Sequence, residues 1–402
     1  MKLHWQIFLS LVSGVIFGIL LPGITPSVSW IGDMFINALS MLIVPLMFFS
    51  IANSICGIQG SSFSLKRLWT KTFAYYVLTM LIAITTGLLL VNIIKPGNSV
   101  QLELAGSIPE NLGQTSLKDI VVGFVPKNIF YAFTQNSTIP VIFISFLVGL
   151  SIPKISSEGK SALTVFIKGG QEVMFIITKW IIRFSPLGIF AIVAKQVSAA
   201  GDVVALLRVI LFYFLTVTIG LAVHTFIWLP LILRFGYGVK PWRHFKNMST
   251  PLLTAFTTSS SGATMPLTMY AVEHKDGISS KITHFTIPLG TAINMDGTAL
   301  LECVAVIFIA QAYGIDLSVA QQALVVFTSL LCAIGAASIP MSALVMMALI
   351  LNVVGLPLEG IGLVIGVDRL LDMMRTAVNV YGDTCVAVMV AKSEGEKLPV
   401  DV

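Results

Sequence analysis

The stretch DRLLDMMRTAVNVYGDTCVAVMV, residues 368–390, decides how this chain must fold. It places three aspartates, two arginines and an asparagine on a segment that is otherwise suited to lipid. A charge at bilayer depth costs at least about 3 kcal/mol, so such a segment is tolerable only against a protein interior or a wet cavity. Steps of four, three, four and four residues put the main polar residues on one face of a helix, namely Asp368, Asp372, Arg375, Asn379 and Asp383.

The whole chain has the composition of a membrane protein. Of its 402 residues 56% are hydrophobic and only 11% are charged, which excludes an ordinary soluble globule. Apolar runs at 7–21, 73–94 and 206–233 are long enough to cross about 30 Å of hydrocarbon. We therefore expect one all-α, polytopic domain over 1–402, with a lipid bilayer around it and no appended soluble enzyme.

The basic residues lie at the ends of the apolar runs, so the net charge of +5 does not indicate nucleic-acid binding. The connection 96–119 instead carries Glu103 and Glu110 and is expected to face outward. The positive-inside rule then places both termini in the cytoplasm. We expect the protein to lie in the inner (plasma) membrane of the cell. The four cysteines show no C-x-x-C spacing, so buried, unpaired thiols are expected.

Six spans are expected near 5–22, 30–56, 69–95, 119–151, 161–196 and 203–233. The pattern then changes to PLLTAFTTSSSGATMPLTMYAV, residues 251–272. Its two arms of about ten residues surround a small-residue tip and are too short to cross, which predicts a re-entrant hairpin at about 249–274. A second hairpin is predicted at about 318–355, around AIGAASIPMSALVMM. The alternative is a pair of ordinary spans kinked at Gly and Pro.

A hairpin followed by a helix with a polar motif occurs twice, over 249–311 and 318–391. Counting crossings gives the two units opposite orientations. Inverted repeats with interrupted helices are typical of secondary transporters, whose binding site lies near the membrane midplane.

Two polar motifs suggest which ligands bind there. Asn294 and Asp296 beside Gly297 could form an oxygen cage for Na⁺ with unwound backbone carbonyls, or could merely cap a kink. In the other motif, Arg375 alone leaves three aspartates under-compensated unless Arg369 also folds inward; a buried ion-pair ladder is the plain alternative.

The sequences SSSGATMPLT, NMDGT and DRLLDMMRTAVNVYGD resemble the hairpin-tip, seventh-helix and eighth-helix motifs of the dicarboxylate/amino acid:cation symporter family, which includes glutamate/aspartate transporter homologues. The likeness covers nearly the whole chain, including MLIVPLMFFSI in the second span. It implies eight transmembrane helices plus two re-entrant helical hairpins, and a homotrimer that works as an elevator. Its scaffold would comprise 1–68 and 119–200, and its transport domain 69–95 and 203–392.

The resemblance also implies a substrate site. Arg375, assisted by Thr298, would bind the side-chain carboxylate of an acidic amino acid, because guanidinium binds carboxylates bidentately. Asp372 with Thr376 would accept its ammonium group, and Asn379 with the backbone around Ser260 its α-carboxylate. The implied substrate residues are Arg375, Asp372, Asn379, Thr298, Thr376, Ser260, Thr258, Ile339 and Ala343, of which the last two would close over the ligand.

Three sodium sites are implied in the same way, with no organic cofactor. The first combines Asp383 with the carbonyls of Gly290, Asn294 and Asn379. The second combines Asp296 with the Asn294 side chain, Thr79 and the Tyr76 carbonyl. The third consists of the carbonyls of Ala292, Ala333, Ile334 and Ala336.

Several positions depart from the family pattern. Met80 stands where archaeal relatives carry a sodium-binding serine. A second arginine of the family is absent, since Thr258 and Met373 stand at its two positions, and Met341 is bulky for a hairpin tip. Glu302 resembles the proton-coupled members. A carboxyl group that burial makes costly to ionise can carry a proton, whereas a satisfied core glutamate is the alternative.

The sequence therefore predicts a symporter, not an enzyme, that imports aspartate, glutamate or a related dicarboxylate with Na⁺ and with H⁺ as a further candidate. A proton-coupled dicarboxylate transporter or a neutral amino acid transporter of the same family is the alternative. A remote alternative is an intramembrane aspartyl protease built on Asp296 and Asp383. Arg375 argues against it, since a nearby cation would keep both carboxylates ionised.

Overall fold

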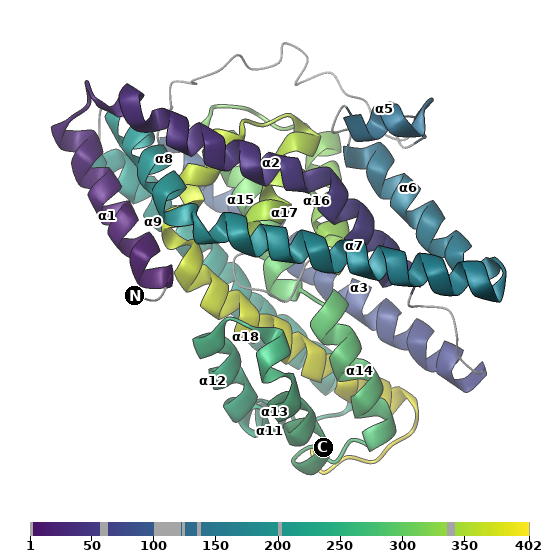
Figure 1. Ribbon diagram of the computed structural model, residues 1–402. Helices are drawn as coiled ribbons and strands as arrows, with labels where there is room; N and C mark the ends of the chain where they lie inside the picture. The colour runs from purple at the N-terminus through teal and green to yellow at the C-terminus, as the bar shows by residue number, and fades with distance from the viewer. Residues whose placement is uncertain are drawn as a thin grey trace.

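A computed structural model describes residues 3–56, 63–99, 122, 125–134, 138–199, 203–335 and 342–401. Over these ranges the chain is helical, and its one strand-like pairing is an isolated bridge between Val239 and Asp401 (Figure 1). The all-α prediction is confirmed. Ile339 and Ala336, together with Glu103 and Glu110, lie outside the described residues.

Four helical stretches of the described chain are long and apolar enough to cross a membrane, judged by length and composition alone. They are Thr25–Asn53, Arg67–Asn98, Val204–Gly236 and Ser280–Ala312, and a bent pair would make a fifth. That pair covers the single span expected at 161–196, but with a bend that was not expected. The chain bends there by 55° between α7 (Ser157–Arg183) and α8, because Pro186 lacks an amide donor and its ring would clash in a continuous helix.

The early helices pack mainly on one another. α1 (Leu3–Leu20) lies along α8 (Ser185–Ala199), and α2 (Thr25–Cys56) contacts α6 (Thr138–Ser151), α7 and α8. Gly14 and Gly18 permit the close approach of α1, since a Cβ on either would lie within 2.8 Å of a carbonyl oxygen of α8. Small residues four apart are a common helix-packing device in membranes.

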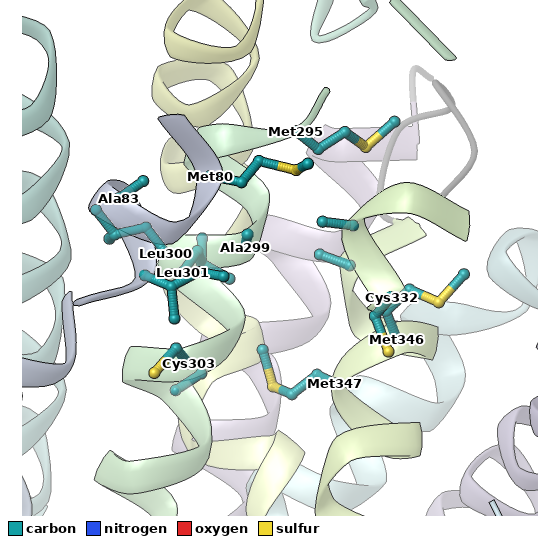
Figure 2. Packing of buried hydrophobic residues seen from close by; sticks show 14 of the residues in the cluster. Met80, Ala83, Met295, Ala299, Leu300, Leu301, Cys303, Cys332, Met346 and Met347 are labelled. Carbon is teal, nitrogen blue, oxygen red and sulfur yellow. The ribbon is translucent and has the colours of Figure 1, made fainter. Parts of the chain in front are cut away.

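The later helices surround α15 (Asp296–Ala312), in which only Gln311 is not fully buried. It contacts α3 (Phe63–Ile94), α9 (Val203–Val223) and α18 (Ile361–Ser393). A helix that is apolar all round is expected to be buried in this way. Figure 2 shows part of this core, where Leu300 and Leu301 lie beside Ala83, and Cys303, Cys332, Met346 and Met347 lie nearby.

Two pairs of short helices complete the later half. α12 (Ser249–Thr258) and α13 (Ser261–His274) lie beside α18, whereas α16 (Val319–Gly335) and α17 (Ser342–Val354) contact α2 (Figure 1). At about 1.5 Å per residue, α12 is too short to cross a bilayer. The tip between α12 and α13 turns through Ser259, at φ 51°.

The remaining elements are short, apart from α14 (Ser280–Ile293), which precedes α15. They are η1 (Pro96–Ser99), α5 (Ile129–Thr134), η2 (Ile152–Lys154), η3 (His224–Trp228), α10 (Leu229–Leu231), η4 (Ile232–Gly236), α11 (Pro241–Asn247) and η5 (Leu358–Gly360).

The chain after α18 is tied to α3 by an ion pair of 2.5 Å between Lys71 and Glu394. The Lys71 hydrogen bond lowers the pKa of Glu394 from its ordinary value. All four cysteines are buried and free, as predicted.

Candidate substrate and cation site

The site is centred where the helix between Ser280 and Ala312 breaks. α14 ends at Ile293 and α15 begins at Asp296, with Asn294 in an extended conformation between them. The first amides of α15 have no partner within their own helix. The side-chain oxygen of Asn379 accepts hydrogen bonds from two of them, Gly297 N at 2.8 Å and Thr298 N at 3.4 Å. α18 thus holds the broken end of α15, and the local unwinding predicted at this motif is confirmed.

Polar side chains of α18 and α15 surround Arg375, which is 2% exposed. Its Nε and Nη2 atoms donate to Asp372 Oδ1 at 3.0 and 2.6 Å, and its Nη1 donates to Thr298 Oγ1 at 3.3 Å. We call Asp372, Arg375 and Thr298 the arginine cluster. It brings together the side chains predicted for the substrate's carboxylate and ammonium groups.

Thr376 and Asn379 border the arginine cluster. The Thr376 hydroxyl donates to the backbone oxygen of Asp372 at 2.6 Å, and the Asn379 amide donates to Thr298 Oγ1 at 3.1 Å. Both side chains were predicted to bind substrate directly. In this structure each stabilises the surroundings of Asp372 and Thr298.

Arg369 folds inward, which resolves the condition left open by the sequence. Its Nη1 donates to Asp372 Oδ2 at 3.2 Å, so each oxygen of this carboxylate has a guanidinium partner. Asp368, one turn earlier, is 2% exposed, and its Oδ2 has no hydrogen-bond partner among the described residues. This end of α18 therefore does contain part of the ion-pair ladder that was the alternative interpretation.

A second polar group lies two turns further along α18. We call Asp383, Asn294 and Asp296 the carboxylate cluster; all three are at most 1% exposed. Asn294 Nδ2 donates to Asp383 Oδ1 at 2.9 Å. Asn294 Oδ1 and Asp296 Oδ1 are buried without a hydrogen-bond partner in the described part of the chain. Such oxygens are available to a hard cation.

Two glycines let the backbone approach the carboxylate cluster. A Cβ at Gly290 would lie 2.5 Å from Asp383 Oδ1, and a Cβ at Gly382 would overlap Asp296 Oδ2. The carboxylates are therefore packed directly against main chain. Gly290 was a predicted carbonyl ligand, whereas Gly382 was not recognised as part of the site.

α3 adds further oxygens to this region. The Thr79 hydroxyl donates to the Tyr76 carbonyl at 3.1 Å, and the Tyr76 hydroxyl donates to Thr286 O at 2.9 Å. Both residues are fully buried. Met80 is also buried, and Figure 2 shows its side chain pointing the same way as Met295, just before Asp296.

His224 is a site residue that the sequence interpretation missed. Its Nε2 lies 3.2 Å from Asp296 Oδ2, and both side chains are fully buried. It begins the π-helical turn η3, and such turns are frequent at functional sites. The available signal was an ionisable residue inside an apolar span, which is a functional candidate by default.

Glu302 lies one turn after Thr298 on the same face of α15. It is fully buried, and neither carboxyl oxygen has a hydrogen-bond partner among the described residues. Arg375 is near enough to interact with it electrostatically. The described residues therefore supply no hydrogen bond of the kind that a satisfied core glutamate would make.

The hairpin residues are less closely connected to the site. Thr258 is exposed and donates to Thr254 O, and Ser260 accepts from Ala263 N at the start of α13. Ala333, Ile334 and Ala343 are buried in α16 and α17, whereas Ala292 is exposed. Among the described residues, no group of three or more His, Cys, Asp or Glu side chains has a metal-binding arrangement.

A helix broken beside buried carboxylates, a buried arginine on the same scaffold and several long apolar helices define an ion-coupled membrane transporter. The model of the family described as "Sodium:dicarboxylate symporter family" matches residues 3–393, and the chain belongs to this family. The predicted family is confirmed. The prediction that the chain is not an enzyme is also confirmed, because the family consists of transporters.

Three relatives illustrate the likeness. The "Proton/sodium-glutamate symport protein" of Geobacillus stearothermophilus is 32% identical over 98% of this chain and 95% of its own length. The "Proton/glutamate-aspartate symporter" of Escherichia coli is 30% identical over 98% of this chain and 93% of its own. The "Excitatory amino acid transporter 2" of Mus musculus is 33% identical over 93% and 75%, respectively.

Proposed function

We propose that the protein imports an acidic amino acid, aspartate or glutamate, together with Na⁺. The observation that carries this proposal is the pair of different polar clusters that α18 forms with the start of α15. Arg375 is a buried cation that fits a substrate carboxylate, and the carboxylate cluster offers buried oxygens that have no partner in the described ranges and fit sodium.

Charge balance provides the coupling mechanism. Asp296, Asp372, Asp383 and Arg375 carry a formal charge of −2 (three negative, one positive), and an acidic amino acid adds −1. Three monovalent cations would cancel this total. Because an uncompensated ion in a low dielectric costs several kcal/mol, the domain that holds substrate without its cations should cross the membrane slowly.

The roles of the site residues follow the predicted assignments. Arg375 binds the side-chain carboxylate, Asp372 the ammonium group and Asn379 the α-carboxylate, each after exchanging a present partner for substrate. Asp383 and Asp296 each hold a sodium ion. The Asn294 side chain serves the second, with Thr79 and the Tyr76 carbonyl, and backbone carbonyls complete the sites.

For the architecture we propose eight membrane helices, two re-entrant hairpins and a homotrimeric elevator in the plasma membrane, with both termini cytoplasmic. Residues 1–68 and 119–200 form the scaffold, and 69–95 with 203–392 form the moving domain. The packing supports this division, because α1, α2, α6, α7 and α8 mainly contact one another.

The experiment is uptake of radiolabelled aspartate and glutamate into proteoliposomes, with sodium, pH and voltage gradients imposed one at a time. An inward sodium gradient should drive accumulation. With three Na⁺ per substrate, two net positive charges enter, so an interior-negative potential should add about 2.3 kcal/mol per charge per 100 mV. Uptake that ignores both voltage and cation gradients would contradict the proposal.

Glu302 supports proton coupling as a second candidate, because its carboxyl group is buried without a hydrogen-bond partner among the described residues. The variant Glu302→Gln mimics a permanently protonated side chain. Proton-coupled uptake should lose most of its pH dependence in this variant while its sodium dependence remains. The control Glu172→Gln removes an exposed carboxylate from α7 and should change neither. An unchanged pH profile in Glu302→Gln would exclude Glu302 as the group that carries a coupled proton.

A further inference from the structure

Arg369 binds the Asp372 carboxylate, which the ammonium group of the substrate also needs under the proposed function. Its guanidinium donates to Asp372 Oδ2, and the other oxygen of that carboxylate is bonded by Arg375. Under the proposed function, Asp372 must accept the ammonium group of the substrate. The Asp372 carboxylate already accepts three hydrogen bonds from two guanidinium groups, so an ammonium group that binds it competes with one of the two arginines.

The structure indicates which arginine moves. The Arg375 side chain is 3% exposed and also bonds Thr298, so it is fixed between α15 and α18. The Arg369 side chain is 28% exposed, and its neighbour Leu370 is 55% exposed. Arg369 can therefore swing outward without taking a buried charge out of a closed cavity, whereas Arg375 cannot.

The charges of this stretch balance only while Arg369 lies inward. Asp368 and Asp372 contribute two negative charges, and Arg369 and Arg375 contribute two positive ones. Both arginines act electrostatically on Asp368 as well as on Asp372. Without Arg369, one negative charge of this buried group would remain uncompensated.

We propose that Arg369 is a built-in counter-cation of the empty carrier, which leaves Asp372 when the substrate's ammonium group arrives and returns when it departs. The inference rests on the proposed function and extends it. In the loaded carrier the substrate's ammonium group takes the place of Arg369 at Asp372, and in the empty carrier Arg369 takes the place of the ammonium group. The return step then needs no soluble cation, such as K⁺, at this carboxylate.

The test separates two transport modes in proteoliposomes. Net uptake requires the empty carrier to return, whereas exchange of external labelled glutamate for internal unlabelled glutamate does not. Arg369→Gln should lower net uptake at least about tenfold, because an uncompensated buried charge costs more than the 1.4 kcal/mol of one decade. Exchange should fall by less than about threefold, since the loaded carrier that carries out exchange has Arg369 away from Asp372 already.

Two further variants make the test specific. Arg369→Lys keeps the charge and should restore net uptake to within about threefold of the natural protein. Arg243→Gln removes an exposed arginine from α11 and should alter neither mode. Arg369→Gln should also bind glutamate about two- to fivefold more tightly, because the competitor for Asp372 is gone.

Several results would overturn the inference. Equal losses of net uptake and exchange in Arg369→Gln would indicate a merely structural role, and unchanged net uptake would remove the proposed one. If that variant does not fold, the natural protein decides, since strict dependence of its net uptake on internal K⁺ contradicts a built-in cation. Absence of both modes in the natural protein would instead refute the proposed function.

Discussion

The arginine cluster and the carboxylate cluster share helix α18, yet they balance their charges differently. Each oxygen of Asp372 has a guanidinium partner, from Arg375 or Arg369. Asp383 instead has the amide of Asn294, and Asp296 has His224. In the described part of the chain, no lysine or arginine forms an ion pair with either of these two carboxylates.

Under the proposed function, this difference would let residues of one helix take part in binding two kinds of ligand. A buried carboxylate that is paired with an arginine can exchange this contact for the ammonium group of an amino acid. The arginine can then bind a carboxylate group of the same amino acid. A buried carboxylate without one remains under-compensated and attracts cations from solution. On α18 the proposed substrate end, at Asp372 and Arg375, is therefore about two turns from the proposed cation end, at Asp383.

The largest effect is expected when the arginine cluster loses its fixed cation. Arg375→Ala leaves Asp372 without its main partner and removes the bidentate donor for substrate, a change of about 3–5 kcal/mol in similar buried pairs. Acidic amino acid uptake should fall at least about a hundredfold. Competition assays with neutral amino acids would measure whether they are accepted instead.

Arg375→Lys is the matched control, since it keeps the charge but not the planar fork. It should retain more acidic uptake than the alanine variant and less than the natural protein. Unchanged aspartate uptake in Arg375→Ala would show that the substrate end is located elsewhere.

The next effect concerns the cation end. Asp383→Asn preserves the shape of the side chain but removes its charge, so sodium affinity should fall about ten- to a hundredfold. Calorimetric titration of substrate at a series of sodium concentrations would measure this. Asp33→Asn, on an aspartate whose side chain is 50% exposed beside Lys195, should leave the sodium dependence unchanged. If both variants behave alike, Asp383 is not a sodium ligand.

A smaller effect tests the close packing around the cation end. Gly382→Ala would place a Cβ against Asp296 Oδ2 and Asn294 Nδ2, and sodium affinity should fall about tenfold as these groups shift. Alanine favours a helix interior over glycine by up to about 1 kcal/mol, so loss of helix would not explain such a result. Gly169→Ala, in open space on α7, is the control and should have no effect on sodium binding.

Much of this arrangement could be predicted because its signals are local. The spacing from Asp368 to Asp383 places a polar stripe on one helical face, and the small-residue tips predict breaks wherever the chain cannot continue as a helix. The break at Asn294 follows from the same kind of motif. Each of these features depends on a few residues that are neighbours in the sequence, so it can be predicted without knowledge of the tertiary contacts.

The missing parts depend on partners distant in the chain. His224 pairs with a carboxylate 72 residues away, and no local pattern specifies that contact. Arg369 could equally well have pointed toward solvent, and only the packing around Asp372 decides its direction. The bend at Phe184 was overlooked for a different reason, since Pro186 is a local signal that the apolar composition outweighed.

The smallest effect should come from Met80, a buried residue that follows Thr79 in α3 and has no side-chain oxygen. Met80→Ser adds a hydroxyl next to Thr79, so sodium should bind about two- to threefold more tightly; the gain is small because Thr79 and the Tyr76 carbonyl are already in place. Removing a buried methionine also costs about 2–5 kcal/mol of stability. Met80→Ala has the same cavity without the hydroxyl and should show the lower melting temperature alone. Equal sodium affinities in both variants would place Met80 outside the cation end.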